Sequence, residues 1–367
     1  MRHMTSPNGT EPNGTEPHWT EPGAYPVADG VHRIPLPLPM DGLRAVNVYA
    51  LDTDAGLTLI DGGWAVEDAR RQLEDGLKEI GYKLSDITRF LVTHVHRDHY
   101  TQAVVVRREF GSHVSLGIGD KPTLDMILER HADPTPARLR RAGAARVADS
   151  WSRTISRQPD PEDWAYPDAW LEADHTLEVG GRTLDAVSTP GHTQGHFCFA
   201  DPAAGLLFAG DHVLPTITPS IGFESAFAAQ PLGDFLSSLA KVRALPDLRL
   251  LPAHGPVTTS THARIDELIA HHEERLALCE QAVAAGAATA YDVAKQLPWT
   301  RRGKSLADLD LFNAALASLE TFAHLELLAA QGRVHRAEDG GVVGYAPGRR
   351  IGTCGMPSST NSGPQGS

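Results

Sequence analysis

Histidine and aspartate side chains gather where short apolar segments end, and this feature constrains the fold more than any other. The apolar run RFLV leads directly into THVHRDH, which carries His94, His96, Asp98 and His99. If His94 and His96 end a strand, their side chains point to the same face and can bind one metal ion. The chain then turns toward a helix and places Asp98 and His99 on the neighbouring side, where a second ion can bind.

Three further segments end in the same way. STPGHTQGH supplies His192, FAGDH supplies Asp211 and LPAHGP supplies His254. Each of these segments contains a glycine, which permits a tight turn after a strand. Loop ends on a rigid sheet are where sites are commonly built. A chance His-rich turn could explain HVHRDH alone, but four such segments in one chain indicate a metal site.

Strand-like and helix-like segments are mixed along the chain rather than separated by half. We expect strands at 45–53, 57–61, 183–189, 196–200 and 206–210, and helices at 66–80 and 231–244. The RFLVTHVH segment is a further expected strand, and HYTQAVVVRREFG is an expected helix that ends at a glycine. This mixture predicts an α/β fold. Two sheets with helices outside, an αββα sandwich, is the favoured layering, although the pattern allows other α/β arrangements.

The composition divides the chain into four parts. Residues 1–22 and 349–367 are poor in core-forming side chains, so we expect disordered tails. Residues 23–260 form the expected catalytic domain, which a helical insertion interrupts at about 120–172. Residues 261–348 follow the order helix, helix, helix, hairpin, which is typical of a winged-helix domain.

In this order, THVHRDH, TPGHTQGH, AGDH and PAHGP resemble the metallo-β-lactamase superfamily. The C-terminal segment is similar to the winged helix of the lactamase-beta-2-like branch, so the resemblance extends from about residue 25 nearly to residue 348. It implies a metallo-β-lactamase sandwich that binds two zinc ions, although iron or manganese can occupy related ligand sets. It assigns His94, His96 and His192 to the first metal, Asp98, His99 and His254 to the second, and a bridging role to Asp211.

The resemblance also implies a hydrolytic reaction. Two ions roughly 3.5 to 4 Å apart can share a hydroxide, because coordination lowers the pKa of water from about 15.7 to about 7. This metal-bridging hydroxide would attack a small thioester, lactone or ester. Asp98 is the expected catalytic residue, since it can orient the hydroxide while it binds a metal.

Three other residues are candidates for orienting the ligands. Asp61 lies in the IDGG turn, whose aspartate commonly braces the metal-binding loop in the family, although an ordinary turn-capping role is a nearly equal alternative. His196 and His212 flank proposed ligands and could contact them or the substrate. A structural, hydrogen-bonded imidazole is the more common role for such histidines.

The insertion carries aromatic residues that could line a substrate pocket above the metals. They are Trp164, Tyr166 and Trp170. Lids of such enzymes are often loops with apolar anchors. The alternative is that these residues form the insertion's own small core, because a helical insertion must bury some apolar surface.

Charge and composition limit the partners. The net charge of −13 disfavours attraction to nucleic acid or to anionic membranes, and it favours a small-molecule substrate. The chain has no apolar run of about 18 residues and no secretory signal at its N-terminus. Three cysteines far apart in sequence argue against a disulfide framework. We therefore expect a soluble cytoplasmic protein.

Two alternative functions stay open. Lactamase-beta-2-like relatives with this tail cleave RNA, so a single-strand endoribonuclease is the second hypothesis. Against it, residues 262–348 carry eight Arg and Lys but twelve Asp and Glu, and the basic cluster is confined to Arg301, Arg302 and Lys304. The third hypothesis is a ligand-sensing module that binds nucleic acid. Its expected recognition helix, at 306–328, is acidic and apolar, which fits packing or homodimer contacts better.

Overall fold

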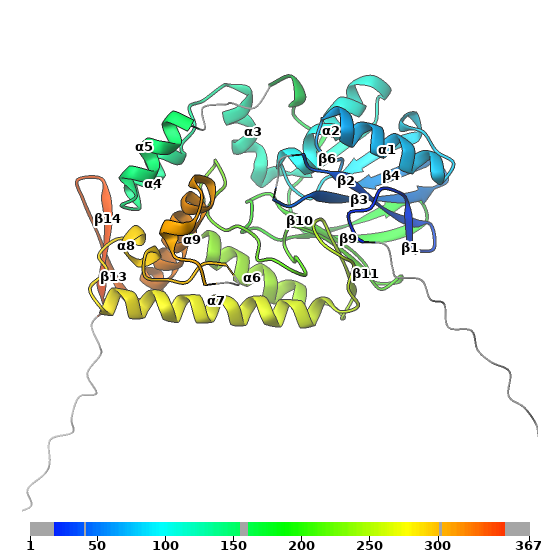
Figure 1. Ribbon diagram of the computed structural model, residues 1–367. Helices are drawn as coiled ribbons and strands as arrows, with labels where there is room; N and C mark the ends of the chain where they lie inside the picture. The colour runs from blue at the N-terminus through cyan, green and yellow to red at the C-terminus, as the bar shows by residue number, and fades with distance from the viewer. Residues whose placement is uncertain (1–17, 40–41, 155–160, 301–302, 349–367) are drawn as a thin grey trace, which may run out of the picture.

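Two sheets form the centre of the protein in the computed structural model, which describes residues 18–39, 42–154, 161–300 and 303–348 (Figure 1). The first sheet has seven strands in chain order: β1 Tyr25–Ala28, β2 Val31–Pro37, β3 Ala45–Thr53, β4 Gly56–Ile60, β5 Ile87–Leu91, β6 His113–Gly117 and β7 Ala169–Leu171. The second sheet has the order β12-β11-β10-β9-β8, with bounds β8 His175–Val179, β9 Arg182–Ser188, β10 Phe197–Asp201, β11 Leu206–Gly210 and β12 Arg249–Pro252.

The inner faces of the two sheets share one hydrophobic cluster. Leu51 and Leu91 of the first sheet belong to it together with Leu184, Phe199 and Phe208 of the second, and all five are buried. Since each strand also turns apolar side chains outward, helices must cover the outer faces.

Helices cover each outer face (Figure 1). Helices α1 (Glu67–Glu79) and α2 (Arg97–Phe110) bury Leu73 and Ala103 against the first sheet. Helices α6 (Pro231–Arg243) and α7 (Thr261–Ala284) cover the second. The four layers confirm the predicted αββα sandwich, and α2 ends at Gly111 in the left-handed conformation as expected.

The strand predicted to carry His94 and His96 ends earlier than expected. β5 stops at Leu91, so both histidines lie in a loop and not on the strand. The physical reason is that side-chain carboxylates replace strand partners here. The main-chain N–H of Thr93 donates to Asp61 Oδ1 at 2.7 Å, and that of Val95 donates to Asp120 Oδ2 at 2.8 Å.

The insertion packs partly against the C-terminal segment. Its helices are α3 Lys121–Leu128, α4 Thr135–Arg141 and α5 Ala145–Thr154. Leu139 and Trp151 from this region share a buried cluster with Ala315 and Leu319 of α9 (Leu311–Ala330). The insertion therefore does not bury all its apolar surface within itself. Its final part, predicted as a loop, includes β7, which extends the first sheet beside β6.

The C-terminal segment has the predicted order of elements. After α7 come α8 Ala290–Ala294, α9, β13 Val334–Asp339 and β14 Val342–Pro347. The hairpin pairs as an antiparallel two-stranded sheet. Phe322 and Leu325 of α9 are buried in the cluster that also contains Phe235 of α6, so intramolecular packing accounts for the apolar character of this helix. The winged-helix assignment and the homodimer stay predictions.

Part of the predicted N-terminal tail takes a defined position. Arg33 Nη1 donates to the carbonyl of Trp19 at 2.6 Å, which ties residues 18–22 to β2. The rest of the predicted tails, like the proposed basic residues Arg301 and Arg302, lies outside the described residues. Within the described part of the chain, no helix is long and apolar enough to cross a membrane.

The cluster between the sheets should determine the stability of the fold. Phe199 is fully buried there, so we expect Phe199→Ala to lower the free energy of unfolding by about 3 to 5 kcal/mol. Phe110 is 44% exposed, so Phe110→Ala should change it by less than about 1 kcal/mol. Urea unfolding of both variants checks this. Equal effects would contradict the proposed location of the core.

Candidate metal centre

Three imidazoles from two loops meet at one point. His94 and His96 lie in the loop after β5, and His192 lies in the loop between β9 and β10. His96 Nδ1 is 2.9 Å from His94 Nε2 and 3.0 Å from His192 Nε2. The three rings are steeply inclined to one another, and their ligand atoms form one candidate metal-binding group. Three nitrogens around one point suit a zinc-like ion.

A second group lies beside the first. Asp98 and His99 occupy the first turn of α2, and His254 follows β12. Asp98 Oδ2 is 3.6 Å from His99 Nε2 and 3.4 Å from His254 Nε2. One carboxylate oxygen and two imidazole nitrogens therefore face a common point, which again is a suitable ligand set for zinc.

Asp211 contacts both groups. It directly follows β11, and its Oδ1 lies 3.4 Å from His254 Nε2 and 3.7 Å from His99 Nε2. Its other oxygen, Oδ2, lies 3.5 Å from His192 Nε2. The structure thus brings together all seven candidate ligands that the sequence suggested, and Asp211 presents one oxygen to each of the two groups.

Some of the candidate ligand atoms are buried and have no hydrogen bond, which indicates whether these residues suit metal ions. Within the described residues, His99 Nε2, His254 Nε2 and Asp211 Oδ1 are buried and have no hydrogen-bond partner. Such atoms are rare, because leaving a buried polar group unsatisfied costs about 1 to 3 kcal/mol. Coordination to a cation would satisfy all three, so these residues fit divalent metal ions.

In three of the ligand rings described so far, the protein contacts the second nitrogen, Nδ1. His192 Nδ1 lies 2.8 Å from the carbonyl oxygen of Ser220, and His254 Nδ1 lies 2.7 Å from that of Ala45. His94 Nδ1 lies 3.1 Å from Thr93 Oγ1. Donation to these oxygens would fix the tautomer that leaves Nε2 free to bind a metal.

Asp61 contacts both a ligand and the ligand-bearing loop. Its Oδ2 lies 2.8 Å from His99 Nδ1, and its Oδ1 accepts the main-chain N–H of Thr93. Asp61 itself has a φ of 63°, an uncommon conformation for a residue with a side chain. Asp61 thus connects the His99 ring to the loop that carries His94 and His96, which a residue that only caps its own turn would not do.

The two other candidate histidines differ in their contacts. The main-chain N–H of Asp211 donates to His196 Nε2 at 3.1 Å, and His196 Nδ1 lies 2.8 Å from Thr189 Oγ1. His196 therefore holds the Asp211 turn in place. His212 is fully buried, and its ring packs edge-on against Phe235 with centroids 5.1 Å apart. Its described contacts are those of a packing residue.

The aromatic residues of the insertion contact the outer layer. Trp164 packs near Tyr100 of α2, with ring centroids 6.1 Å apart, in the cluster beneath the first sheet's helices. Tyr166 donates its hydroxyl to Asp125 Oδ1, and its ring lies 6.3 Å from that of Trp170. These contacts favour the core alternative over the substrate pocket, which stays a prediction.

One residue of the site was missed by the sequence patterns. Asp120 is fully buried and accepts hydrogen bonds from both metal-binding loops. Its sequence context, LGIGD, offered only two nearby glycines as a signal. A single aspartate after a short strand has many ordinary roles, so the pattern alone could not select it.

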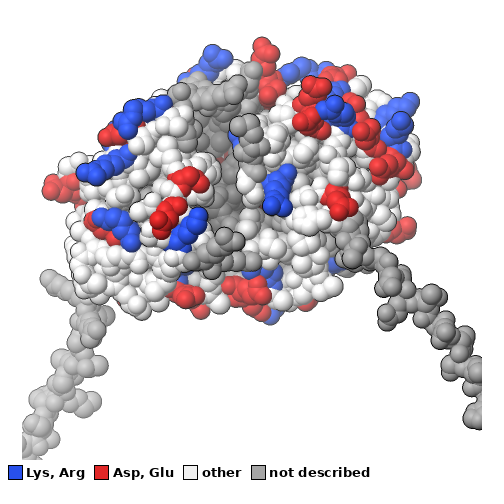
Figure 2. Space-filling view, viewed as in Figure 1, with Lys and Arg blue, Asp and Glu red and all other residues white. Residues whose placement is uncertain are grey.

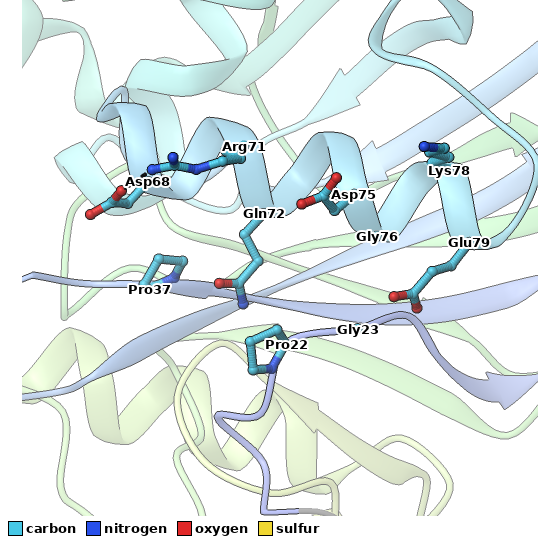
Figure 3. A pocket seen from close by; sticks show the side chains of 10 residues that line it. All are labelled: Pro22, Gly23, Pro37, Asp68, Arg71, Gln72, Asp75, Gly76, Lys78 and Glu79. Carbon is cyan, nitrogen blue, oxygen red and sulfur yellow. Dashed lines mark hydrogen bonds and ion pairs between the residues drawn. The ribbon is translucent and has the colours of Figure 1, made fainter.

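Two cavities lie away from the proposed metal ligands. A groove of about 850 Å³ lies between α1 and residues 22–23, and charged side chains of α1 line it (Figure 3). Two of the lining side chains are already engaged: Gln72 donates to the carbonyl of Pro35, and Glu79 accepts the N–H of Ala24. A second cavity of about 760 Å³ is lined by Thr216, Ile217 and Thr218 together with α7 and α9. No proposed metal ligand is among the residues that line this cavity either.

The electrostatics of the centre favour cation binding. Burial tends to raise the pKa of the Asp98 and Asp211 carboxyls, but the imidazoles of His99 and His254 outweigh it and lower both pKa values. For His99, burial opposes the charged ring, yet the carboxylates of Asp61, Asp98 and Asp211 raise its pKa to about 10. Without metal, a proton on His99 thus occupies the place of a cation.

Metal binding should therefore release protons. At pH 7 the metal-free protein carries a proton on His99, whose pKa is about 10, and a ligand nitrogen must be deprotonated. We expect apparent metal affinity to rise with pH up to about that value, and about one proton to be released per chain from this residue at pH 7. Calorimetric titration with Zn²⁺ in two buffers of different ionisation enthalpy measures the number. Identical heats in both buffers would contradict the expectation, and His99→Ala should release fewer protons.

Comparisons with known proteins agree with this geometry. A family model described as the metallo-beta-lactamase superfamily matches residues 41–254. The Beta-lactamase-like protein 2 homolog of Caenorhabditis elegans is 28% identical over 254 residues, which cover 68% of this chain and 69% of the relative. The Probable metallo-hydrolase YqjP of Bacillus subtilis is 25% identical over 334 residues, which cover 87% of this chain and 97% of that protein.

Solved structures extend the similarity beyond the matched domain. A metallo-beta-lactamase family protein from Thermus thermophilus has a TM-score of 0.72 and 28% identity, and the match covers 88% of this chain and 100% of that one. A beta-lactamase domain protein from Burkholderia ambifaria has a TM-score of 0.73 and 26% identity, with coverages of 92% and 96%. Such coverage includes much of the C-terminal segment. The family match over more than half of the sequence, on a fold of this kind, shows that the chain belongs to the metallo-β-lactamase superfamily.

Proposed function

We propose that this chain is a dinuclear metal-dependent hydrolase that acts on a small thioester, lactone or ester. The observation that carries the proposal is the convergence of two ligand groups on a shared carboxylate, with three buried ligand atoms that have no hydrogen bond within the described residues. The residues fit two divalent ions, and zinc is the favoured metal because imidazole and carboxylate are its usual ligands. Its relative from Bacillus subtilis, a probable metallo-hydrolase, supports the reaction class.

The ligands would divide between the two ions. His94, His96 and His192 would hold the first, and Asp98, His99 and His254 would hold the second, with Asp211 between them. When bound, the ions would supply Lewis acidity and make water a nucleophile at neutral pH. Asp61, Ser220 and Ala45 would fix the ring orientations through the hydrogen bonds already described.

Asp98 is the residue we assign to orienting the attacking water. Its side chain is 14% exposed, whereas that of Asp211 is 9% exposed and those of His99 and His254 are almost completely buried. An ionised carboxylate accepts hydrogen bonds on both oxygens, so one oxygen can face the metal group while the other holds a water. The lowered pKa of Asp98 keeps it ionised at neutral pH.

The charge of the chain supports a small-molecule substrate. The net charge is −13, and Figure 2 shows basic and acidic side chains interspersed on the visible described surface, without a continuous basic stripe. Polyanion binding would need a basic footprint instead.

The endoribonuclease and the nucleic-acid-binding module are less well supported. The C-terminal segment is acidic, and half of the residues of α9 are buried within the protein, which limits the surface that this helix could present to a groove of nucleic acid. A substrate panel separates the three functions. Thioesters, lactones, nitrocefin and single-stranded RNA would each be tested with and without chelator, and RNA binding would be tested at physiological salt. Chelator-sensitive cleavage of RNA alone would favour the nuclease.

The bridging position of Asp211 gives a sharper test. We expect Asp211→Asn to lower kcat/KM by about 10³-fold or more, because it removes a charge shared by both metal groups. Asp174→Asn is the matched control. Asp174 is 53% exposed and pairs with Lys241, so its loss should leave kcat/KM unchanged. Full activity of Asp211→Asn would refute the proposed centre.

A further inference from the structure

The three-histidine group depends on the relative position of two loops from different sheets. The loop with His94 and His96 follows β5 of the first sheet, and the loop with His192 connects β9 and β10 of the second. His96 Nδ1 of the first loop and His192 Nε2 of the second lie 3.0 Å apart. A small shift of either loop would move the three nitrogens apart. A contact that joins the two loops directly therefore controls the geometry of the three-histidine group.

Asp120 makes such a contact. It ends the short 3-10 helix η2 (Ile118–Asp120) after β6 and is fully buried. Its Oδ2 accepts the main-chain N–H of Val95 at 2.8 Å, and its Oδ1 accepts that of Gly195 at 2.7 Å. Val95 lies between two proposed ligands of the first loop, and Gly195 lies three residues after the ligand of the second. One carboxylate therefore bridges both loops.

Glycines allow the backbones to approach closely enough for this bridge. A Cβ atom at Gly117 would lie 1.9 Å from the carbonyl oxygen of Gly195, and one at Gly119 would lie 2.2 Å from that of Gln194. A Cβ at Gly195 would lie 2.4 Å from the main-chain nitrogen of Asp120. Each distance is too short for any side chain, so all three glycines are required by the same contact.

We infer that Asp120 is a positioning residue, which fixes the spacing of the two loops and so prepares the three-histidine group for its metal. The inference rests on the proposed metal-dependent function. An ionised carboxylate can accept a hydrogen bond on each of its two oxygens, whereas the side-chain amide of Asn has only one accepting oxygen. Burial raises the pKa of Asp120 to about 7, against the lowering effects of the Thr193 side chain and of the Gly195 and Val95 N–H groups, so keeping the ionised form here costs free energy. The two main-chain bonds offset part of that cost.

A second buried carboxylate provides a matched control. Glu224 Oε2 accepts the N–H of Gln194 at 3.1 Å, and its Oε1 accepts the hydroxyl of Thr123 at 2.8 Å. In Glu224→Gln, the amide oxygen can still accept from Gln194, and the amide nitrogen can donate to the Thr123 hydroxyl. In Asp120→Asn, one of the two main-chain N–H groups must face the amide nitrogen. Both variants replace a buried carboxyl group by an amide in the same region, but only Asp120→Asn breaks the bridge.

The experiment measures metal affinity of the full-length protein. Zn²⁺ dissociation constants of wild type and both variants would be determined by competition with a chromophoric chelator, with unfolding midpoints recorded in parallel. We expect affinity for one of the two ions to fall roughly ten- to hundredfold in Asp120→Asn and to change less than about twofold in Glu224→Gln. Equal affinities in Asp120→Asn and wild type would overturn the inference alone. Absence of metal binding by the wild type would instead refute the proposed function.

Hydrogen exchange of the metal-free wild type gives an independent test that needs no variant to fold. If Asp120 holds the loops before the metal binds, peptides covering Val95 and Gly195 should exchange their amide protons slowly without metal. Rapid exchange there, with protection that develops only after Zn²⁺ is added, would show that the metal and not Asp120 sets the spacing.

Discussion

The fold gathers imidazoles and carboxylates into a buried site, where the protein does not supply a hydrogen-bond partner for every polar atom. His99, His254 and Asp211 each present a buried ligand atom that has no hydrogen bond within the described residues. In an apolar interior such atoms destabilise the fold unless a cation compensates them. The stabilising contacts lie in another part of the fold. A hydrophobic cluster between the two sheets supports the loops, whose own polar atoms are not all hydrogen-bonded.

The site is held by carboxylates that replace regular sheet hydrogen bonds. Asp61 accepts from Thr93 and contacts His99, while Asp120 accepts from Val95 and Gly195. These bonds end β5 early and free the following residues to adopt ligand geometry. The same residues therefore interrupt the secondary structure and build the site. We expect a departure from regular strand geometry at such a site. Side chains along a strand point alternately to opposite faces, whereas metal ligands must converge on one point.

Patterns of apolar residues predicted strands β3, β4, β5, β9, β10 and β11, the covering helices and the segments that supply the candidate ligands, because burial and chain direction are local properties of the sequence. They did not predict β1, β2, β6 or β8. Contacts made through the main chain could not be predicted in this way. The partners of His192 and His254 are carbonyl oxygens of Ser220 and Ala45, and any residue type supplies such an oxygen. The packing of Trp151 against α9 and the pairing of β7 with β6 likewise depend on tertiary placement, to which helical or strand periodicity is blind.

The central claim is that two cations complete this buried group. Elemental analysis of the full-length protein, purified without added metal or chelator, tests it most directly. We expect about two divalent ions per chain, with zinc favoured by the nitrogen-rich ligand set. Protein that contains no bound metal and yet hydrolyses its substrate at the full rate would contradict it.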